Sequence, residues 1–395
     1  ILSGDFNPDH AIAKIDKAFS YMKEKPVPEY TFAPEDAITS PVIKEVVGPD
    51  AESVTIAFRL PSNQDKDAAL ANLVGSILTN GKAGLIDLNL VKKQKLLKAS
   101  AFSYLLVDHG LLYISASPSQ GQSLEDVKKL LLNEIENLKK GNFDDDLIPS
   151  IVNNIKKHKI QQTESYGDRA YMLMDAFTGK LNWRDQVAYV NDLSKVTKKD
   201  IMDFANKYFG NNYVAVLKHK GERTDIEKIE KPTITPVETN ADKQSAFVKM
   251  INQMPSTPVA PVFLDYNKDL QRSKLGKAEV YYVQNKENQL YRLNFRYKIG
   301  TLNDLKMGLA AQYIQFLGTD KKSAEQISKE FYKIASSFRV HTADEYTFVT
   351  IEGLQENFEA AVTLYENLIQ NLKADEQALE ALKARIQKYR SDVKA

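Results

Sequence analysis

An internal repeat with a period near 235 residues constrains this chain more than any other feature. The strand-like segment around Phe58 recurs around Phe295, and the alternating segment at 111–118 recurs at 346–353. The elements between these segments follow in the same order in both copies, with an offset that drifts slowly. Such drift is expected of a diverged tandem duplication. The sequence therefore predicts homologous domains in series.

The repeat divides the 395 residues into four parts. Residues 1–25 correspond to the tail of a preceding repeat, and residues 40–230 form a complete one. Residues 231–264 contain five prolines, which is typical of a semi-extended interdomain linker, with a short helix expected at 244–252. Residues 268–395 match the first half of a further repeat. We expect the natural chain to be longer at both ends.

Strands and helices alternate within the complete repeat. Residues 54–60 alternate apolar and polar side chains as a strand does, and residues 101–107 and 111–117 are two further strands. Asp108 and His109 lie at the tight turn that joins these two strands into a hairpin. Helices are expected at 67–78, 124–140, 144–160 and 201–209, the last behind the near capping box Thr197-Lys198-Lys199-Asp200.

Near the N-terminus, Asn7 followed by Pro8 predicts the start of a helix, because Asn is a good N-cap and Pro suits the first turn. Residues 1–5 before it have the pattern of a strand that runs into a turn. Apolar side chains follow at helical spacing and predict one buried helix face: Ile12, Ile15, Ala18, Phe19 and Met22.

Composition excludes several classes of protein. Lys and Arg number 53 and Asp and Glu number 52, so the net charge of +1 does not give the broad positive surface of a protein that binds nucleic acid or an anionic membrane. The sequence has no apolar run of the 18 residues that a membrane span needs. The absence of cysteine excludes thiol catalysis, disulfides and cysteine-ligated zinc. It also favours a periplasm or cell envelope over the cytoplasm, while the localisation itself stays open.

Several local sequences resemble the pitrilysin/insulinase-like zinc peptidases, the inverzincins. ILTNGKAGLIDLNLVKKQKL at 77–96 is similar to the family's Gly-rich turn and the helix after it, and GDFNPDHAIAKIDKAF at 4–19 resembles the last strand and helix of such a domain. ENLKKGNFDDDLI (136–148) and LSKVTKKDIMDFANKYF (193–209) fit later segments. The resemblance implies an α+β fold of tandem homologous domains, each a mostly antiparallel sheet with helices packed on one face.

The motif that defines this family, H-x-x-E-H, is absent. In the family its two histidines bind zinc one helical turn apart, and its glutamate activates the attacking water. No two of the five histidines here lie within ten residues of each other. The segment GLAAQYIQFLGT (308–319) nevertheless resembles the motif helix and its exit. The residues at the His, Glu and His positions are Leu309, Gln312 and Tyr313, and in the complete repeat Asn72, Gly75 and Ser76.

Neither set of residues has the chemistry to hold Zn²⁺ or to polarise a water molecule. We therefore expect no catalytic residue, no metal ligand and no cofactor in this chain, and zinc only in the parent enzyme. By itself the chain is predicted to be inactive, with the catalytic domain elsewhere in the same chain or in a partner subunit.

Three other clusters have a structural and a functional interpretation. His109 beside Asp108 has the residue types of an acid/base pair, but Asp-His-Gly favours a tight turn, and His341 occupies the equivalent hairpin of the next repeat. Asp144-Asp145-Asp146 lacks the spacing of a calcium loop and favours N-cap and helix-dipole roles. Arg169 and Tyr171, with Tyr166 on one predicted helix, are candidate substrate-binding residues, because the family holds peptide with an Arg and a Tyr of a non-catalytic domain.

Two functions follow from the resemblance. In the first, the chain is the non-catalytic segment of a zinc metalloendopeptidase that degrades peptides or unfolded polypeptides in a closed chamber, and it forms chamber wall and hinge. In the second, it is a catalytically dead binding or assembly subunit that pairs with an active zinc peptidase. Neither involves nucleic acid or a membrane span.

Overall fold

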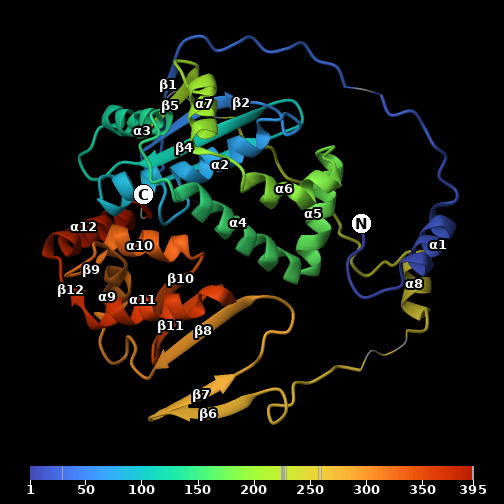
Figure 1. The fold of residues 1–395 in the computed structure, drawn as a ribbon. Coiled ribbons are helices and arrows are strands. Elements are labelled where there is room, and N and C mark those ends of the chain that lie inside the picture. Colours follow the sequence, from blue (N-terminus) through green and yellow to red (C-terminus); the bar gives the residue numbers. More distant parts are fainter. Residues whose placement is uncertain (29, 224–226, 228, 257, 259, 394–395) are drawn as a thin grey trace. The chain divides into compact units, whose positions relative to one another are not determined.

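The computed structural model describes residues 1–28, 30–223, 227, 229–256, 258 and 260–393. The chain divides into two compact units, one made of residues 1–222 together with 287–395 and the other of residues 223–286. Figure 1 shows the helices and strands of both units.

The first sheet of the larger unit consists of β1 (Val42–Gly48), β2 (Ser53–Leu60), β3 (Lys98–Leu105), β4 (Gly110–Ser117) and β5 (Tyr213–Lys220). Its strand order is β1-β5-β2-β4-β3. All neighbours are antiparallel except β1, which lies parallel to β5 at one edge. Side chains of β2 and β5 alternate between buried and partly exposed, so one face of this sheet packs against the core.

The helices of the same repeat are α2 (Ala68–Leu78), α3 (Leu124–Lys139), α4 (Leu147–Glu164), α5 (Tyr166–Thr178), α6 (Trp183–Leu193) and α7 (Lys198–Tyr208). α2, α3 and α7 contact the sheet and one another. Within this core, the Phe58 ring lies 5.0 Å from the Phe209 ring, centroid to centroid. Burying each ring stabilises the fold by about 1.5–3 kcal/mol. The predicted capping box of Thr197 and Asp200 begins α7.

A second sheet repeats the arrangement of the first. It consists of β8 (Leu290–Tyr297), β10 (Ser337–Thr342) and β11 (Thr347–Leu354), and the helices around it are α9 (Met307–Tyr313), η2 (Ile314–Phe316), α10 (Ala324–Lys333), η3 (Gln355–Asn357), α11 (Phe358–Gln370) and α12 (Glu376–Val393). Its strand order, β10-β11-β8, matches β3-β4-β2 of the first sheet. Phe58 and Phe295 thus lie on equivalent strands. The predicted α+β fold is confirmed, and the internal repeat is seen as the recurrence of one topology.

The two repeats pack directly on each other through α4 and α10. Tyr332 of α10 is buried in the core cluster of the first repeat. Asn154 of α4 donates a hydrogen bond from its side-chain amide to the Tyr332 carbonyl, 2.8 Å away. Ser328 donates to the Lys82 carbonyl at 2.8 Å, in the loop after α2. A small two-stranded sheet of β9 (Gly318–Thr319) and β12 (Leu372–Lys373) lies within the second repeat.

The smaller unit contains α8 (Ala246–Gln253) and a hairpin of β6 (Gln271–Leu275) with β7 (Ala278–Tyr282). Residues 231–245, all of them described and exposed, form no helix or strand. α8 corresponds to the short helix expected at 244–252. The domain boundaries themselves stay predictions.

The N-terminal segment differs from expectation in two ways. α1 (Pro8–Phe19) begins as predicted, with the Asn7 side chain accepting a hydrogen bond from the His10 N–H at 3.0 Å. However, every residue of α1 is at least partly exposed, and Ile12 keeps 56% of its surface in solvent. The predicted buried face is wrong in this chain, because burial needs an element packed on that face. Residues 1–5 likewise form no strand among the described residues, since a strand needs a partner to pair with.

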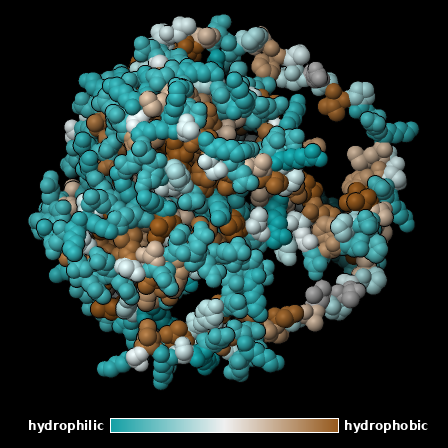
Figure 2. Space-filling view, in the orientation of Figure 1, coloured by the Kyte–Doolittle hydropathy of each residue, from teal (hydrophilic) through white to brown (hydrophobic). Residues whose placement is uncertain are grey.

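Figure 2 shows that hydrophilic residues cover most of the face in view. In the described part of the chain, no helix combines the length and the apolar character that crossing a membrane requires.

Candidate functional site

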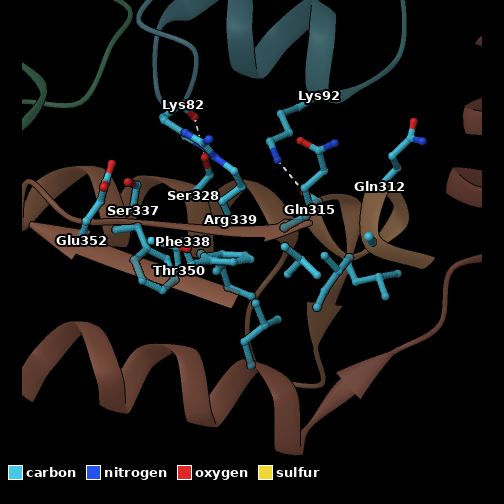
Figure 3. A pocket seen from close by; sticks show the side chains of 18 of the residues that line it. Lys82, Lys92, Gln312, Gln315, Ser328, Ser337, Phe338, Arg339, Thr350 and Glu352 are labelled. Atoms are coloured by element: carbon cyan, nitrogen blue, oxygen red, sulfur yellow. Dashed lines mark hydrogen bonds between the residues drawn. The ribbon is translucent and has the colours of Figure 1, made fainter. Parts of the chain in front are cut away.

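A cavity of about 660 Å³ lies in the larger unit, between the loop after α2 and the second sheet. Figure 3 shows Lys82 and Lys92 reaching toward β10 and the segment after α9 from the opposite side. The polar lining residues are Lys82, Lys92, Arg292, Asn294, Gln312, Gln315, Ser328, Ser337, Arg339, Thr350 and Glu352. Both repeats therefore contribute charged side chains to one cavity.

A buried carboxylate fixes the loop that presents Lys82. Asp87 accepts hydrogen bonds from the backbone N–H groups of Asn80 (2.7 Å), Gly81 (2.8 Å) and Gly84 (3.1 Å). Burial raises the pKa of the Asp87 carboxyl group, and these N–H donors act against that rise. Because the Asp87 side chain bonds three N–H groups of this loop, the loop is fixed and so is the backbone position of Lys82. Lys82 is exposed to solvent within the cavity, yet the surrounding protein lowers the pKa of its ammonium group, and nearby Arg339 lowers it further.

Lys92 lies at the end of a π-helical turn, η1 (Asp87–Lys92). Its Nζ donates a hydrogen bond to the Gln315 carbonyl at 2.6 Å and lies 5.5 Å from the centre of the Phe316 ring. Burial lowers the pKa of Lys92 to about 8, and the positive charge of Lys82 contributes. Lys92 is therefore a cation that loses its proton just above neutral pH.

The opposite side of the cavity is formed by the second sheet. Arg339 lies on β10, one of the two edge strands of this sheet, and is exposed. Arg292 of β8 pairs with Glu352 of β11 across the strands, with Nε 3.2 Å from the carboxylate. Thr350 donates a hydrogen bond to the Asn294 side-chain oxygen at 2.8 Å. Positive charge thus predominates on this side too.

The helix that resembles the zinc motif borders the cavity. Leu309, Gln312 and Tyr313 all lie on α9, as the pattern predicted. Gln312 lines the cavity, and its amide is 3.4 Å from the Gly308 carbonyl. The Tyr313 hydroxyl donates to the Asp375 carbonyl at 2.6 Å and accepts from the Asp375 N–H at 2.7 Å.

These three side chains do not fit a zinc ion. Leu309 has no lone pair, the Gln312 amide is not a base, and the Tyr313 hydroxyl already has both its partners. Across the part of the chain that the structure describes, no cluster of three or more His, Cys, Asp or Glu residues is placed to hold a metal ion.

The equivalent positions in the complete repeat have structural contacts. Asn72 donates to the Tyr189 hydroxyl at 3.4 Å, and the Ser76 hydroxyl donates to the Asn72 carbonyl at 3.3 Å. A Cβ at Gly75 would lie 3.1 Å from the backbone nitrogen of Ser103, so this position is closely packed against β3.

The candidate substrate-binding residues lie on α5 and do not line the cavity. Arg169 donates from Nε to the Thr163 carbonyl at 2.7 Å, and its guanidinium group lies 4.9 Å from the centre of the Tyr166 ring. Tyr171 is 63% exposed. The substrate-binding role of Arg169 and Tyr171 stays a prediction.

The structure assigns local roles to the remaining clusters. His109 lies in the turn between β3 and β4, as predicted. His341 was expected at the equivalent hairpin and is the penultimate residue of strand β10, paired with Phe348. The three aspartates before α4 differ from expectation, because Asp146 makes no side-chain cap bond. Instead Asp144 pairs with Lys329 at 2.6 Å, and Asp146 pairs with Lys333, both lysines on α10.

Fold and site together define a class of protein: peptidase-like α+β repeats in series, whose motif-equivalent helix lacks metal-binding side chains. The family model described as "Peptidase M16 inactive domain" matches residues 1–155, and the model "Insulinase (Peptidase family M16)" matches residues 308–395. The chain belongs to this M16 family, the insulinase- and pitrilysin-type peptidases.

Individual relatives agree with this assignment. The chain is 24% identical over 215 residues to a zinc protease, PqqE, from Helicobacter pylori, an alignment that covers 53% of this chain and 48% of PqqE. The crystal structure of a protease from Helicobacter pylori matches with a TM-score of 0.52 at 22% identity, over 55% of this chain and 54% of that one. Pitrilysin matches with a TM-score of 0.55 at 16% identity, over 97% of this chain and 43% of pitrilysin. The chain thus spans about half the length of these relatives.

Proposed function

We propose that this chain is the non-catalytic segment of an M16 zinc metalloendopeptidase, and that it forms wall and hinge of the chamber in which peptides or unfolded polypeptides are cut. The observation that carries this proposal is the side-chain set of α9, where Leu309, Gln312 and Tyr313 replace the metal-binding and water-activating residues. The match of residues 1–155 to an inactive M16 domain supports it.

In this proposal the domains are those of the repeat. Residues 1–25 end a catalytic-type domain, residues 40–230 form a complete non-catalytic domain, residues 231–264 link it to the next, and residues 268–395 begin a further degenerate domain. Zinc is bound by the missing catalytic domain, which lies in the same chain or in a partner subunit. The chemistry that zinc would supply there is the activation of a water molecule for peptide hydrolysis, with residues that would lie outside this chain. A periplasmic or envelope location is part of the proposal and is supported by the cysteine-free composition.

Zinc content tests whether these domains are free of metal sites. The purified chain is loaded with zinc chloride, dialysed, and analysed for metal, and its hydrolysis of a quenched fluorescent peptide is measured. We expect less than one zinc per ten chains and no hydrolysis. One zinc per chain after dialysis would overturn the assignment of both repeats as non-catalytic.

The native size tests whether the chain is a segment or a subunit. An immunoblot of source-cell extract, with antibody against this chain, is expected to show a band of roughly 100 kDa, about four repeats of ordinary domain size. A single band at the 44.6 kDa of this chain would contradict the proposal that the chain is a segment of a longer protein. It would favour the alternative, a catalytically dead binding or assembly subunit that pairs with an active zinc peptidase.

A further inference from the structure

The cavity contains two cations that face each other without an intervening acid. Lys82 and Arg339 come from different repeats, and Figure 3 shows them side by side. Burial lowers the pKa of the Lys82 ammonium group, the positive charge of Arg339 lowers it further, and the charge of Asp87 acts against this fall. Among the described residues, neither side chain has an ion-pair partner. Like charges held together in this way are stabilised when an anion binds between them.

The acidic residues near the cavity are already occupied. Glu352 is the acidic residue of the described lining, and it pairs with Arg292 at 3.2 Å. The Asp87 carboxylate is buried and accepts three backbone N–H bonds. Lys157, whose side chain is buried beneath, lies close enough to Glu352 and Lys82 to interact with both charges. After the pairing of Arg292 with Glu352 is taken into account, the charges of Lys82 and Arg339 give the cavity a net positive charge.

Neutral donors surround the two cations. Ser337, two residues before Arg339 on β10, has a hydroxyl group, and Gln315 has a side-chain amide; both line the cavity. Lys92 adds a third positive charge near the Gln315 end. Carboxylates and phosphates accept hydrogen bonds from such groups: guanidinium, ammonium and amide N–H groups and hydroxyl O–H groups.

We propose that this cavity binds oxyanions through Lys82 and Arg339, and that its ligands are the carboxylates of an acidic stretch of peptide. The cavity volume of about 660 Å³ accommodates several residues of a peptide rather than a single ion. The choice of a peptide over a free phosphate rests on the proposed function, whereas the oxyanion chemistry rests on the cavity alone. The site gives the wall of the chamber a preference for acidic segments.

Direct binding tests the proposal without any hydrolysis. Fluorescence anisotropy of the full chain is measured with a labelled peptide that contains four consecutive glutamates, and with the same peptide carrying glutamines. We expect Lys82→Gln and Arg339→Gln each to weaken binding of the glutamate peptide about tenfold, the size of one charge-assisted hydrogen bond. Arg339→Lys is expected to retain more affinity than Arg339→Gln, and the glutamine peptide is expected not to bind.

A matched control separates this site from general surface charge. Lys93 adjoins Lys92 in sequence, is exposed, and does not line the cavity, so Lys93→Gln is expected to leave binding unchanged. Thermal melts of all variants verify that each one is folded. If Lys82→Gln and Lys93→Gln have equal effects in folded protein, the proposal is wrong.

Inorganic pyrophosphate distinguishes the two sources of oxyanion. Competition of pyrophosphate with the glutamate peptide, lost in Lys82→Gln, agrees with the proposal. Binding of pyrophosphate without binding of the peptide would contradict the peptide as ligand. Anisotropy needs neither zinc nor cleavage. A failure of the peptide to bind would therefore contradict this proposal without affecting the zinc measurement. A zinc site found on α9 would contradict the proposed function without affecting the binding measurement.

Discussion

Asn154 and Tyr332, 178 residues apart, are joined by a buried hydrogen bond of 2.8 Å from the Asn154 side-chain amide to the Tyr332 carbonyl. The same amide donates to the Ser150 carbonyl at 2.8 Å, so one side chain ties α4 to α10 and to its own helix. The Tyr332 ring is buried in the core of the first repeat. The two repeats therefore share part of one core.

Removing this amide should destabilise the chain. In Asn154→Ala the Tyr332 carbonyl loses the side-chain donor but keeps the Ala335 N–H at 3.0 Å, and the bond to the Ser150 carbonyl is lost as well. Each lost hydrogen bond costs about 0.5–1.5 kcal/mol. Urea unfolding of the two proteins measures the difference. Asn153→Ala, at an exposed neighbouring position, serves as control and should change the free energy of unfolding by less than about 0.5 kcal/mol. Equal stability of Asn154→Ala and the parent would show that the bond contributes nothing.

The shared core also predicts that the repeats stay together when the chain is cut between them. A site-specific protease sequence inserted after Asn240, in the exposed stretch, permits one clean cut. The buried contacts of Tyr332, and the ion pairs of Lys329 with Asp144 and Lys333 with Asp146, remain after cleavage. The two pieces should elute as one peak on size exclusion. Separate peaks at micromolar concentration would mean that the linker alone holds the repeats together.

Local patterns predicted the elements that depend on local chemistry. The strand at 54–60 and the hairpin at Asp108 and His109 were predictable because alternation and turn residues act over a few neighbours. The capping box at Thr197 was predictable for the same reason. α1 shows the limit, since its apolar spacing predicts a face to be buried but not which element covers it.

The cavity could not be predicted, because its residues are distant in sequence. Lys82 and Arg339 belong to different repeats, and no local pattern pairs them. The aspartates at 144–146 were expected to cap a helix, whereas Asp144 and Asp146 pair with lysines of α10, which a linear pattern does not show. In the loop at 81–84, Gly81 has a φ of 77°, a backbone conformation that favours glycine.

Gly84 is needed for a different reason, which gives a third prediction. A Cβ there would lie 2.6 Å from the Leu78 carbonyl oxygen and 2.8 Å from the Thr79 Cα, both backbone atoms. Gly84→Ala must therefore displace the loop that holds Lys82, and should lower the free energy of unfolding by about 1–3 kcal/mol.

Gly308→Ala provides the matched control for Gly84→Ala. A Cβ at Gly308 would point into open space on α9, so alanine there should be neutral or stabilising by up to about 1 kcal/mol. Chemical denaturation of both variants beside the parent makes the comparison. If Gly84→Ala were as stable as Gly308→Ala, the close backbone approach would not constrain this loop.

The lowered pKa of Lys92 predicts how the free energy of unfolding changes with pH. The residues whose charges act on it are Lys82, Arg385, Glu325 and Asp87. Burial lowers the pKa of Lys92 to about 8, below its ordinary value of 10.5. Below pH 8 the folded and unfolded chains both hold the proton, so the cost of burying the charge is fully present. Between pH 8 and 10.5 the folded chain releases the proton first, and that cost is relieved.

The parent chain should therefore gain stability relative to Lys92→Met as pH rises from 7 to 9.5, by about 2 kcal/mol. Methionine keeps the length of the side chain without a charge, so the loss of the bond to Gln315 is a constant offset and the change with pH reports the proton. Urea unfolding at both pH values measures the difference, and exposed Lys93→Met should show no such change. A difference that stays constant, or that moves against the parent chain, would mean that Lys92 titrates normally and that protein does not desolvate this end of the cavity.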